Sequence, residues 1–252
     1  MTALFANRGT RLVILVMIIL TFIGIVIAKT HYGRINKAID PRIREARMMY
    51  GRYNRYASEN DTEMVVAILD SIRTIYLSVP HYSDSYELGV IENNLASVYL
   101  TLALSSTGID ERREFLLSAA EEHLLAGIDY YTTWMGRFGD LTEAQISEIV
   151  REEFSGDETL RASKNIDAII RKRTRDLLDA QKETSRRLSV SYSNMGIISR
   201  HREKAEEAVS YYERALEIWS DNHVARNNLN IIFGLPPVKQ SFIRRMFPPD
   251  RL

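Results

Sequence analysis

The feature that most constrains this chain is an uncharged, apolar stretch near its beginning, from residue 12 to residue 28 (LVILVMIILTFIGIVIA). As a helix it would extend about 25 Å, which nearly matches a bilayer hydrocarbon core of about 30 Å. Arg11 and Lys29 flank the stretch, and their long side chains can reach the headgroup regions. We therefore predict a single transmembrane anchor over 12–28, preceded by a short basic tail over 1–11.

Two alternatives to a retained anchor stay open. Val26-Ile27-Ala28 offers small residues near a cleavage point, so the stretch is also compatible with a removed signal peptide. A buried core helix is the other alternative, but a core helix without a polar face is uncommon in a small domain. The apolar run is longer than the usual hydrophobic region of a signal peptide, which favours the anchor.

The charges beside the stretch give conflicting indications of orientation. Only Arg8 and Arg11 precede it, whereas more basic residues follow it: Lys29, Arg34, Lys37, Arg42, Arg44 and Arg47. The positive-inside rule then places the following domain in the cytoplasm, yet a short basic tail before one apolar helix is typical of signal anchors that translocate the next domain. We predict a single-pass membrane protein with an extracytoplasmic soluble domain, periplasmic in a bacterium, and keep the cytoplasmic side as the alternative.

The rest of the chain has the composition of a folded, helical protein. It contains 26% charged and 45% hydrophobic residues with little Gly and Pro, and no segment alternates with period two long enough to form a sheet. We therefore predict an all-α fold. The formal net charge is zero, which gives no indication of a nucleic-acid partner, and the absence of Cys excludes disulfides and thiolate metal sites.

Breaks in the helical pattern divide the chain beyond the anchor into four regions. We predict a basic juxtamembrane amphipathic helix over 29–58, degenerate helical hairpins over 59–156, a long helix with a repeat unit and a capping helix over 157–235, and a tail over 236–252. The cationic face of the juxtamembrane helix could contact lipid headgroups, but we favour a solvated face. Within the hairpins, Thr142-Glu143-Ala144-Gln145 has the spacing of a capping box.

The region 189–222 carries the most informative pattern. Two apolar helical segments lie on either side of a polar turn, and small residues occupy positions where paired helices approach closely: Gly196, Ala208 and Ala215. With the apolar and aromatic residues Tyr192, Met195 and Tyr212, this pattern resembles the tetratricopeptide repeat (TPR), a helix-turn-helix unit of about 34 residues. The departures from the family pattern are Ser199, Ala205 and Ser220.

Parts of the same pattern recur on both sides of this unit. Asn194-Met195-Gly196 recurs as Asn228-Leu229-Asn230 one repeat length later. A looser version begins at Asn93-Asn94-Leu95-Ala96 and continues with Tyr99, Ala119, His123 and Ala126. The segment from Met64 to Pro80 resembles the second helix of an earlier unit. The resemblance therefore implies a TPR-like α-solenoid of antiparallel helix hairpins, preceded by one N-terminal transmembrane helix.

A TPR-like solenoid implies a binding function, because its stacked hairpins leave a concave groove open to a peptide or helix of another protein. By the resemblance, the groove would be lined by Val190, Ser193, Asn194, Ile197, Arg200, Val224, Asn227, Asn228 and Ile231. Some family members grip a C-terminal carboxylate with Asn and basic residues, but the basic positions are uncharged here: Val190, Ser193, Val224 and Asn227. We therefore favour helix-to-helix hydrogen bonding for Asn194 and Asn228.

Motifs that would indicate catalysis or a cofactor are missing from the sequence. The five His residues are scattered, without the spacing of a metal site on one helix, and no phosphate-binding glycine loop or nucleophile elbow occurs. Adjacent pairs such as Glu121-Glu122 diverge by about 100° on a helix, so they cannot converge on one substrate. We expect no enzymatic activity, cofactor, metal or small-molecule substrate.

We therefore predict a membrane-tethered TPR adaptor or scaffold, with other proteins as partners and the lipid bilayer bound through residues 12–28. The assembly would be associated with the cell envelope, as in a secretion, division or motility apparatus. A chaperone-like holdase acting near a protein translocon is the alternative, and selectivity for partners would distinguish the two.

The tail over 236–252 (PPVKQSFIRRMFPPDRL) contains a candidate docking segment. Its apolar residues would share one face of a short helix: Phe242, Ile243, Met246 and Phe247. Because this apolar surface is unfavourable in water, we favour a tail that folds back near Leu229 and Phe233 to cap the last helix. A docking peptide for a partner or a membrane surface is the alternative.

Overall fold

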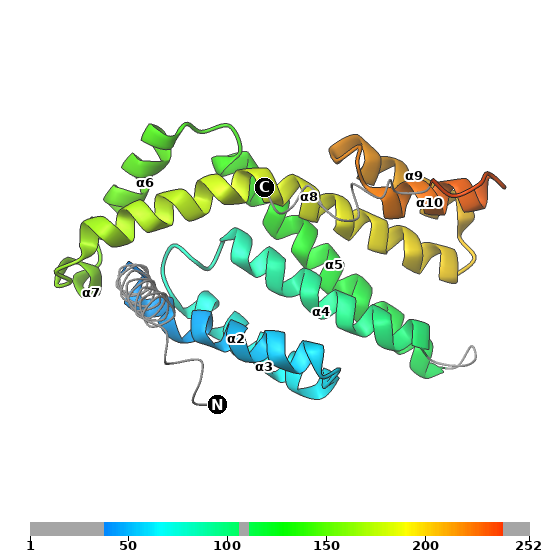
Figure 1. Ribbon diagram of the computed structural model, residues 1–252, viewed down its shortest axis with the longest axis horizontal. Coiled ribbons are helices and arrows are strands. Elements are labelled where there is room, and N and C mark those ends of the chain that lie inside the picture. The colour runs from blue at the N-terminus through cyan, green and yellow to red at the C-terminus, as the bar shows by residue number, and fades with distance from the viewer. Residues whose placement is uncertain (1–37, 106–110, 239–252) are drawn as a thin grey trace, which may run out of the picture.

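The computed structural model describes residues 38–105 and 111–238, and every element in these two ranges is a helix (Figure 1). The all-α prediction is therefore confirmed for this part of the chain. The elements are η2 (Pro41–Ile43), α2 (Arg44–Ser58), α3 (Thr62–Ser78), α4 (Tyr86–Ser105), α5 (Glu111–Phe138), α6 (Glu143–Ser155), α7 (Glu158–Arg161), α8 (Ile166–His201), α9 (Ala205–Ile218) and α10 (His223–Ile232).

Side-chain caps define the beginnings of several helices. Asp61 caps α3, Asp157 caps α7 and Asn222 caps α10, each by accepting a hydrogen bond from a backbone N–H in the first turn. At α6, the hydroxyl of Thr142 accepts from the N–H of Gln145, whose side chain accepts from the N–H of Thr142. The predicted capping box is therefore confirmed.

The structure differs from the sequence prediction in the length of α8. We predicted a boundary near residue 189 between a long helix and a repeat unit, but α8 runs without interruption over 36 residues. The sequence around this point contains neither Gly nor Pro, and the hydroxyl of Ser189 donates to the carbonyl of Ala215 instead of capping a new helix. Consequently, one helix of about 54 Å connects the region of α6 and α7 to the predicted repeat unit.

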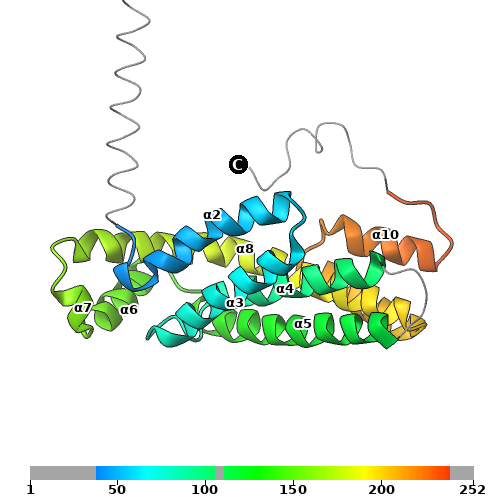
Figure 2. The same ribbon diagram turned by 90° about the horizontal axis from the view of Figure 1, so that it is seen from below.

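Helices that follow one another in the chain pack side by side. The pairs α2–α3, α4–α5 and α8–α9 form hairpins, and each pair contacts the next through α3 with α4, α5 with α8 and α9 with α10. The short helices α6 and α7 lie beside the beginning of α8 (Figure 1). In Figure 2, α2 and α10 lie on one side of the molecule and α5 lies on the other.

The buried apolar residues form three clusters along this arrangement. The largest lies among α2, α3, α4, α6 and the first half of α8, and it contains Trp134 of α5. A second cluster joins α4, α5 and α8, and a third joins α8, α9 and α10 around Tyr212. The core therefore extends along the row of helices, and α8 contributes to all three clusters.

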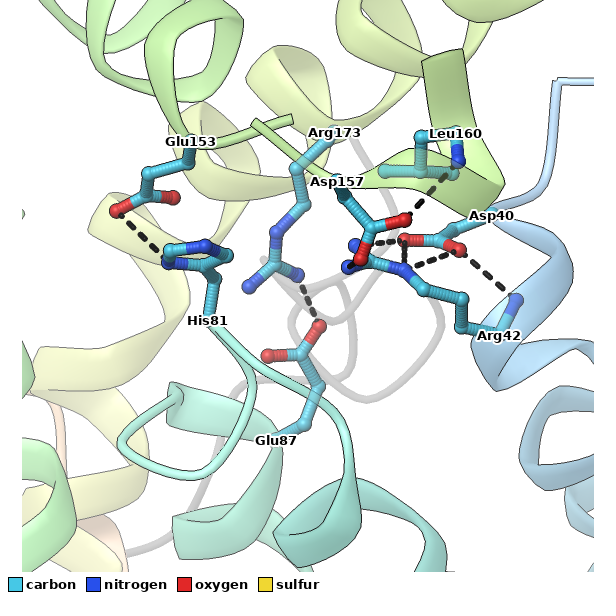
Figure 3. A network of polar contacts seen from close by, with 8 residues as sticks. All are labelled: Asp40, Arg42, His81, Glu87, Glu153, Asp157, Leu160 and Arg173. Carbon is cyan, nitrogen blue, oxygen red and sulfur yellow. Dashed lines mark hydrogen bonds and ion pairs between the residues drawn. The ribbon is translucent and has the colours of Figure 1, made fainter. Parts of the chain in front are cut away.

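A polar network fixes the beginning of the described chain to α7 and α8 (Figure 3). Arg42 pairs with Asp40 and with Asp157, both at 2.7 Å, and Asp157 also accepts from the N–H of Leu160. On the next turn, Arg47 pairs with Asp176 of α8 at 2.8 Å. These contacts hold η2 and α2 against the end of the molecule that contains α7.

No helix within residues 38–105 and 111–238 is long and apolar enough to cross a bilayer. The predicted anchor over 12–28 and the docking segment with Phe242, Ile243, Met246 and Phe247 lie outside the described residues.

Candidate protein-binding groove

The crossing of α8 and α9 brings the predicted small residues into a close contact. A Cβ atom added at Gly196 would lie 2.6 Å from Cε1 of Tyr212, closer than any side chain tolerates. Ala208, Ala215 and Tyr212 are fully buried in the same interface. The prediction that paired helices approach closely at Gly196, Ala208 and Ala215 agrees with this geometry.

The hairpin of α4 and α5 repeats this contact with different residues. A Cβ atom at Gly89 would lie 2.6 Å from Cε1 of Tyr131. The looser repeat pattern is displaced by one residue in α5, where Ala120, Leu124 and Gly127 are buried, rather than Ala119, His123 and Ala126. The predicted residues still border α4, because His123 lies 2.6 Å from Glu92 and its ring stacks on Tyr99, both on α4.

Asn222 connects three helices at the predicted repeat junction. Its Oδ1 accepts from the N–H of Ala225, and its Nδ2 donates to the hydroxyls of Ser189 and Ser193, both at 2.8 Å. The hydroxyl of Ser189 donates in turn to the carbonyl of Ala215 in α9. Ser193 is only 1% exposed, so its assignment to the partner groove was wrong. It faces α10 and satisfies the amide of Asn222 instead.

One partly exposed face of α8 carries three other predicted groove residues. Val190, Asn194 and Ile197 follow the spacing i, i+4, i+7, and each is partly exposed. The amide of Asn194 has no hydrogen-bond partner among the described residues. This face therefore combines aliphatic surface with an amide whose donors and acceptor are unused.

The neighbouring face of α10 carries Val224, Asn227, Asn228 and Ile231. Val224 and Ile231 are 53% and 58% exposed. Asn228 accepts from Nη1 of Arg200 at 2.7 Å and donates to the carbonyl of Val224, so the predicted helix-to-helix bond exists for Asn228 but not for Asn194. The interaction with Asn228 also fixes the position of Arg200. We use the name α8–α10 groove for the two faces together, without the buried Ser193, after the partner groove that the TPR resemblance implies.

A cavity of about 210 Å³ lies further along the row of helices, between α4 and the turn that joins α2 to α3. Asn94 lines it, together with Tyr53, Asn60, Thr62 and Val98. In the predicted repeat pattern, Asn94 of α4 stands at the position of Asn194 of α8. The adjacent Asn93 accepts from the hydroxyl of Ser191, which joins α4 to α8.

Sequence reasoning missed an ionic cluster between α3, α4 and α5. Glu92 accepts from Arg73 at 3.2 Å and lies 2.6 Å from Nδ1 of His123, whose ring stacks on Tyr99. Burial alone would raise the pKa of Glu92, but the hydrogen bonds to His123 and Arg73 outweigh burial and lower this pKa. Glu92 is buried and both partners satisfy its carboxylate, so we assign the cluster to stability.

The described residues contain no group of three or more His, Asp or Glu side chains that could hold a metal ion. Comparisons of the chain with protein-family models, with curated proteins and with solved structures find no match. The proposals below therefore rest on the residues and contacts of this chain.

Proposed function

We propose that this protein is a membrane-tethered adaptor with a TPR-like solenoid, which binds a peptide or helix of another protein in an envelope-associated assembly. The observation that carries the proposal is the α8–α10 groove. There, the unpaired amide of Asn194 lies between Val190 and Ile197, and the exposed side chains of Val224 and Ile231 lie on the adjacent helix.

The chemistry of this groove suits a polypeptide. Aliphatic side chains favour contact with apolar side chains of a partner, since each covered Å² of apolar surface contributes about 25 cal/mol. An unpaired Asn amide offers both a donor and an acceptor, which match the N–H and C=O groups of an extended backbone. A charged substrate or nucleic acid would need a concentration of charge that these residues do not provide.

The contacts of α2 and α8 support a tethered role. Arg42 and Arg47 link the segment behind the predicted anchor to Asp157 and Asp176, at the α7 end of the molecule. The groove residues Val190, Asn194 and Ile197 lie in the last third of the same continuous helix α8. A rigid helix would therefore hold the groove at a fixed distance from η2, the first described element after the predicted anchor.

Site-specific photocrosslinking in intact membranes tests the proposal. A photoreactive amino acid at position 194 of the full chain should yield a few stoichiometric partner proteins by mass spectrometry. The matched control is position 125, because Leu125 is also exposed but lies on α5, opposite α10 in Figure 2. Many unrelated clients at position 194 would indicate the holdase instead, and identical products at both positions would contradict a specific groove.

A further inference from the structure

A second cavity, of about 200 Å³, is lined by residues of α2, α3, α4 and α8. It lies beside the ion pair of Arg47 with Asp176, which connects α2 to α8, and it extends to Arg187, about 16 Å further along α8. It shares no residue with the α8–α10 groove. Two guanidinium groups, one carboxylate and three phenols form its polar lining: Arg47, Arg187, Glu87, Tyr50, Tyr76 and Tyr86.

Two charged side chains of the lining have unused hydrogen-bonding atoms. Nε of Arg47 and Oε2 of Glu87 have no hydrogen-bond partner, and Glu87 is only 6% exposed. Figure 3 shows that one oxygen of Glu87 faces Arg173, whereas the other is directed away from it. Because buried polar groups are normally hydrogen-bonded, an unused donor and an unused acceptor beside one cavity favour a polar ligand.

The three phenols give the cavity aromatic walls with neutral donors. Burial raises the pKa of Tyr50, Tyr76 and Tyr86 well above that of a free phenol, so their hydroxyls stay protonated at neutral pH. None of these hydroxyls has a hydrogen-bond partner among the described residues. They can therefore donate to an anion while their rings contact an aromatic body.

Arg187 gives the cavity one uncompensated positive charge. The other charged groups are paired, Arg47 with Asp176 and Glu87 with Arg173, whereas Arg187 forms no ion pair with a described residue. A guanidinium fork matches the two oxygens of a carboxylate. A monoanion neutralises this charge, whereas a phosphate monoester, with about 1.5 to 2 negative charges at pH 7, exceeds it.

We propose that this cavity binds a small hydroxylated aromatic monocarboxylate. Arg187 holds the carboxylate, the tyrosine rings and Val90 cover the aromatic body, and the free oxygen of Glu87 accepts from the ligand's hydroxyl. The donor is a hydroxyl rather than an ammonium group, because a zwitterion would leave the charge of Arg187 uncompensated. The site takes a small molecule, in contrast to the expectation from the sequence, and it does not depend on the adaptor function.

Isothermal titration calorimetry of the purified full chain tests the proposal with matched probes. We expect para-hydroxyphenylacetate to bind saturably, and its neutral amide and the zwitterion para-hydroxyphenylglycine to bind about tenfold more weakly, since each loses a net charge. Absence of saturable binding of para-hydroxyphenylacetate at millimolar concentration would overturn the proposal, as would equal affinity for the amide. Equal affinity for inorganic phosphate would overturn it in favour of a general anion site.

Substitutions at two adjacent arginines test the location of the site. Arg187→Gln removes the uncompensated charge and should weaken the binding of para-hydroxyphenylacetate about tenfold. Arg186→Gln is the matched control, because Arg186 pairs with Glu183 at 2.8 Å and does not line the cavity, so its affinity should stay that of the natural protein. Titration in the same detergent cancels any partitioning of the probe into micelles. Equal binding by the two variants would overturn the assignment.

A variant that fills the cavity tests the location without changing any charge. Val90→Phe places a ring in the space that the aromatic body occupies, so binding should fall several-fold while circular dichroism shows the helical melting of the natural protein. Natural affinity in Val90→Phe would overturn this cavity as the site. The comparison of probes on the natural protein decides the ligand class even if a variant fails to fold.

Discussion

Arg173 on α8 donates a hydrogen bond to Glu87 on α4, and the two side chains are 6% and 7% exposed (Figure 3). The residues are 86 positions apart in the sequence. The guanidinium also lies over the ring of Tyr82, 4.3 Å from its centroid. A buried charge pair beside an aromatic ring therefore joins α4 to α8.

This ion pair predicts strongly non-additive effects of mutation. Glu87→Leu leaves the Arg173 cation buried without its partner and should lower the free energy of unfolding by about 3 to 5 kcal/mol. The double variant Glu87→Leu/Arg173→Leu removes both charges and should recover most of this loss. Chemical denaturation of a soluble fragment beginning at His31, followed by circular dichroism, gives the coupling energy. Additive losses would contradict the pairing.

The contact between Gly196 and Tyr212 predicts opposite effects for two similar substitutions. Gly196→Ala places a methyl group 2.6 Å from the ring and should destabilise the fold by about 1 to 3 kcal/mol. Gly136→Ala, in α5 with nothing within 4 Å, should instead stabilise by up to about 1 kcal/mol through helix propensity. Thermal unfolding of both variants checks the difference. Equal melting temperatures would refute the predicted crossing.

Local patterns made part of this structure predictable. The helix beginnings at Asp61 and Thr142 follow from capping residues, and the close contacts at Gly196 and Ala208 follow from small residues within apolar helices. Such features depend on neighbours a few positions apart, which the sequence displays directly.

Features that depend on distant residues could not be predicted. The partners of Glu87 and Glu92 lie on other helices, and charged residues are so common in this chain that none of them indicates a pairing. The assignment of Ser193 to the groove failed for a related reason. The repeat pattern correctly indicates a helix at position 193. It does not indicate that the hydroxyl of Ser193 accepts a hydrogen bond from Nδ2 of Asn222 inside the interface.

The apolar stretch over 12–28 predicts behaviour in membranes. If it is retained as a transmembrane helix, membranes washed with alkaline carbonate should keep the full-length chain, and a fragment beginning at His31 should be soluble. Fractionation and immunoblotting provide the measurement. A mature protein whose N-terminus is Lys29 would show that the stretch is a cleaved signal peptide.

The lowered pKa of Glu92 predicts a pH-dependent contribution to stability. Because this pKa is lower in the folded state, the ionised carboxylate stabilises the fold above the unfolded-state pKa of about 4.3. That contribution is lost as the pH falls through the folded-state pKa. The substitution Glu92→Gln keeps the size of the side chain but removes its titration.

At pH 7, the natural protein should therefore exceed Glu92→Gln by about 1 to 3 kcal/mol in the free energy of unfolding, since a hydrogen-bonded charge is lost. The difference should shrink as the pH falls from the unfolded-state pKa of about 4.3 through the lower folded-state pKa, below which both proteins carry a neutral side chain at position 92. Urea denaturation at successive pH values from 7 to 3 measures the difference directly, with other titrating groups common to both proteins. A difference that stays constant over this range would show that the charge of Glu92 contributes nothing.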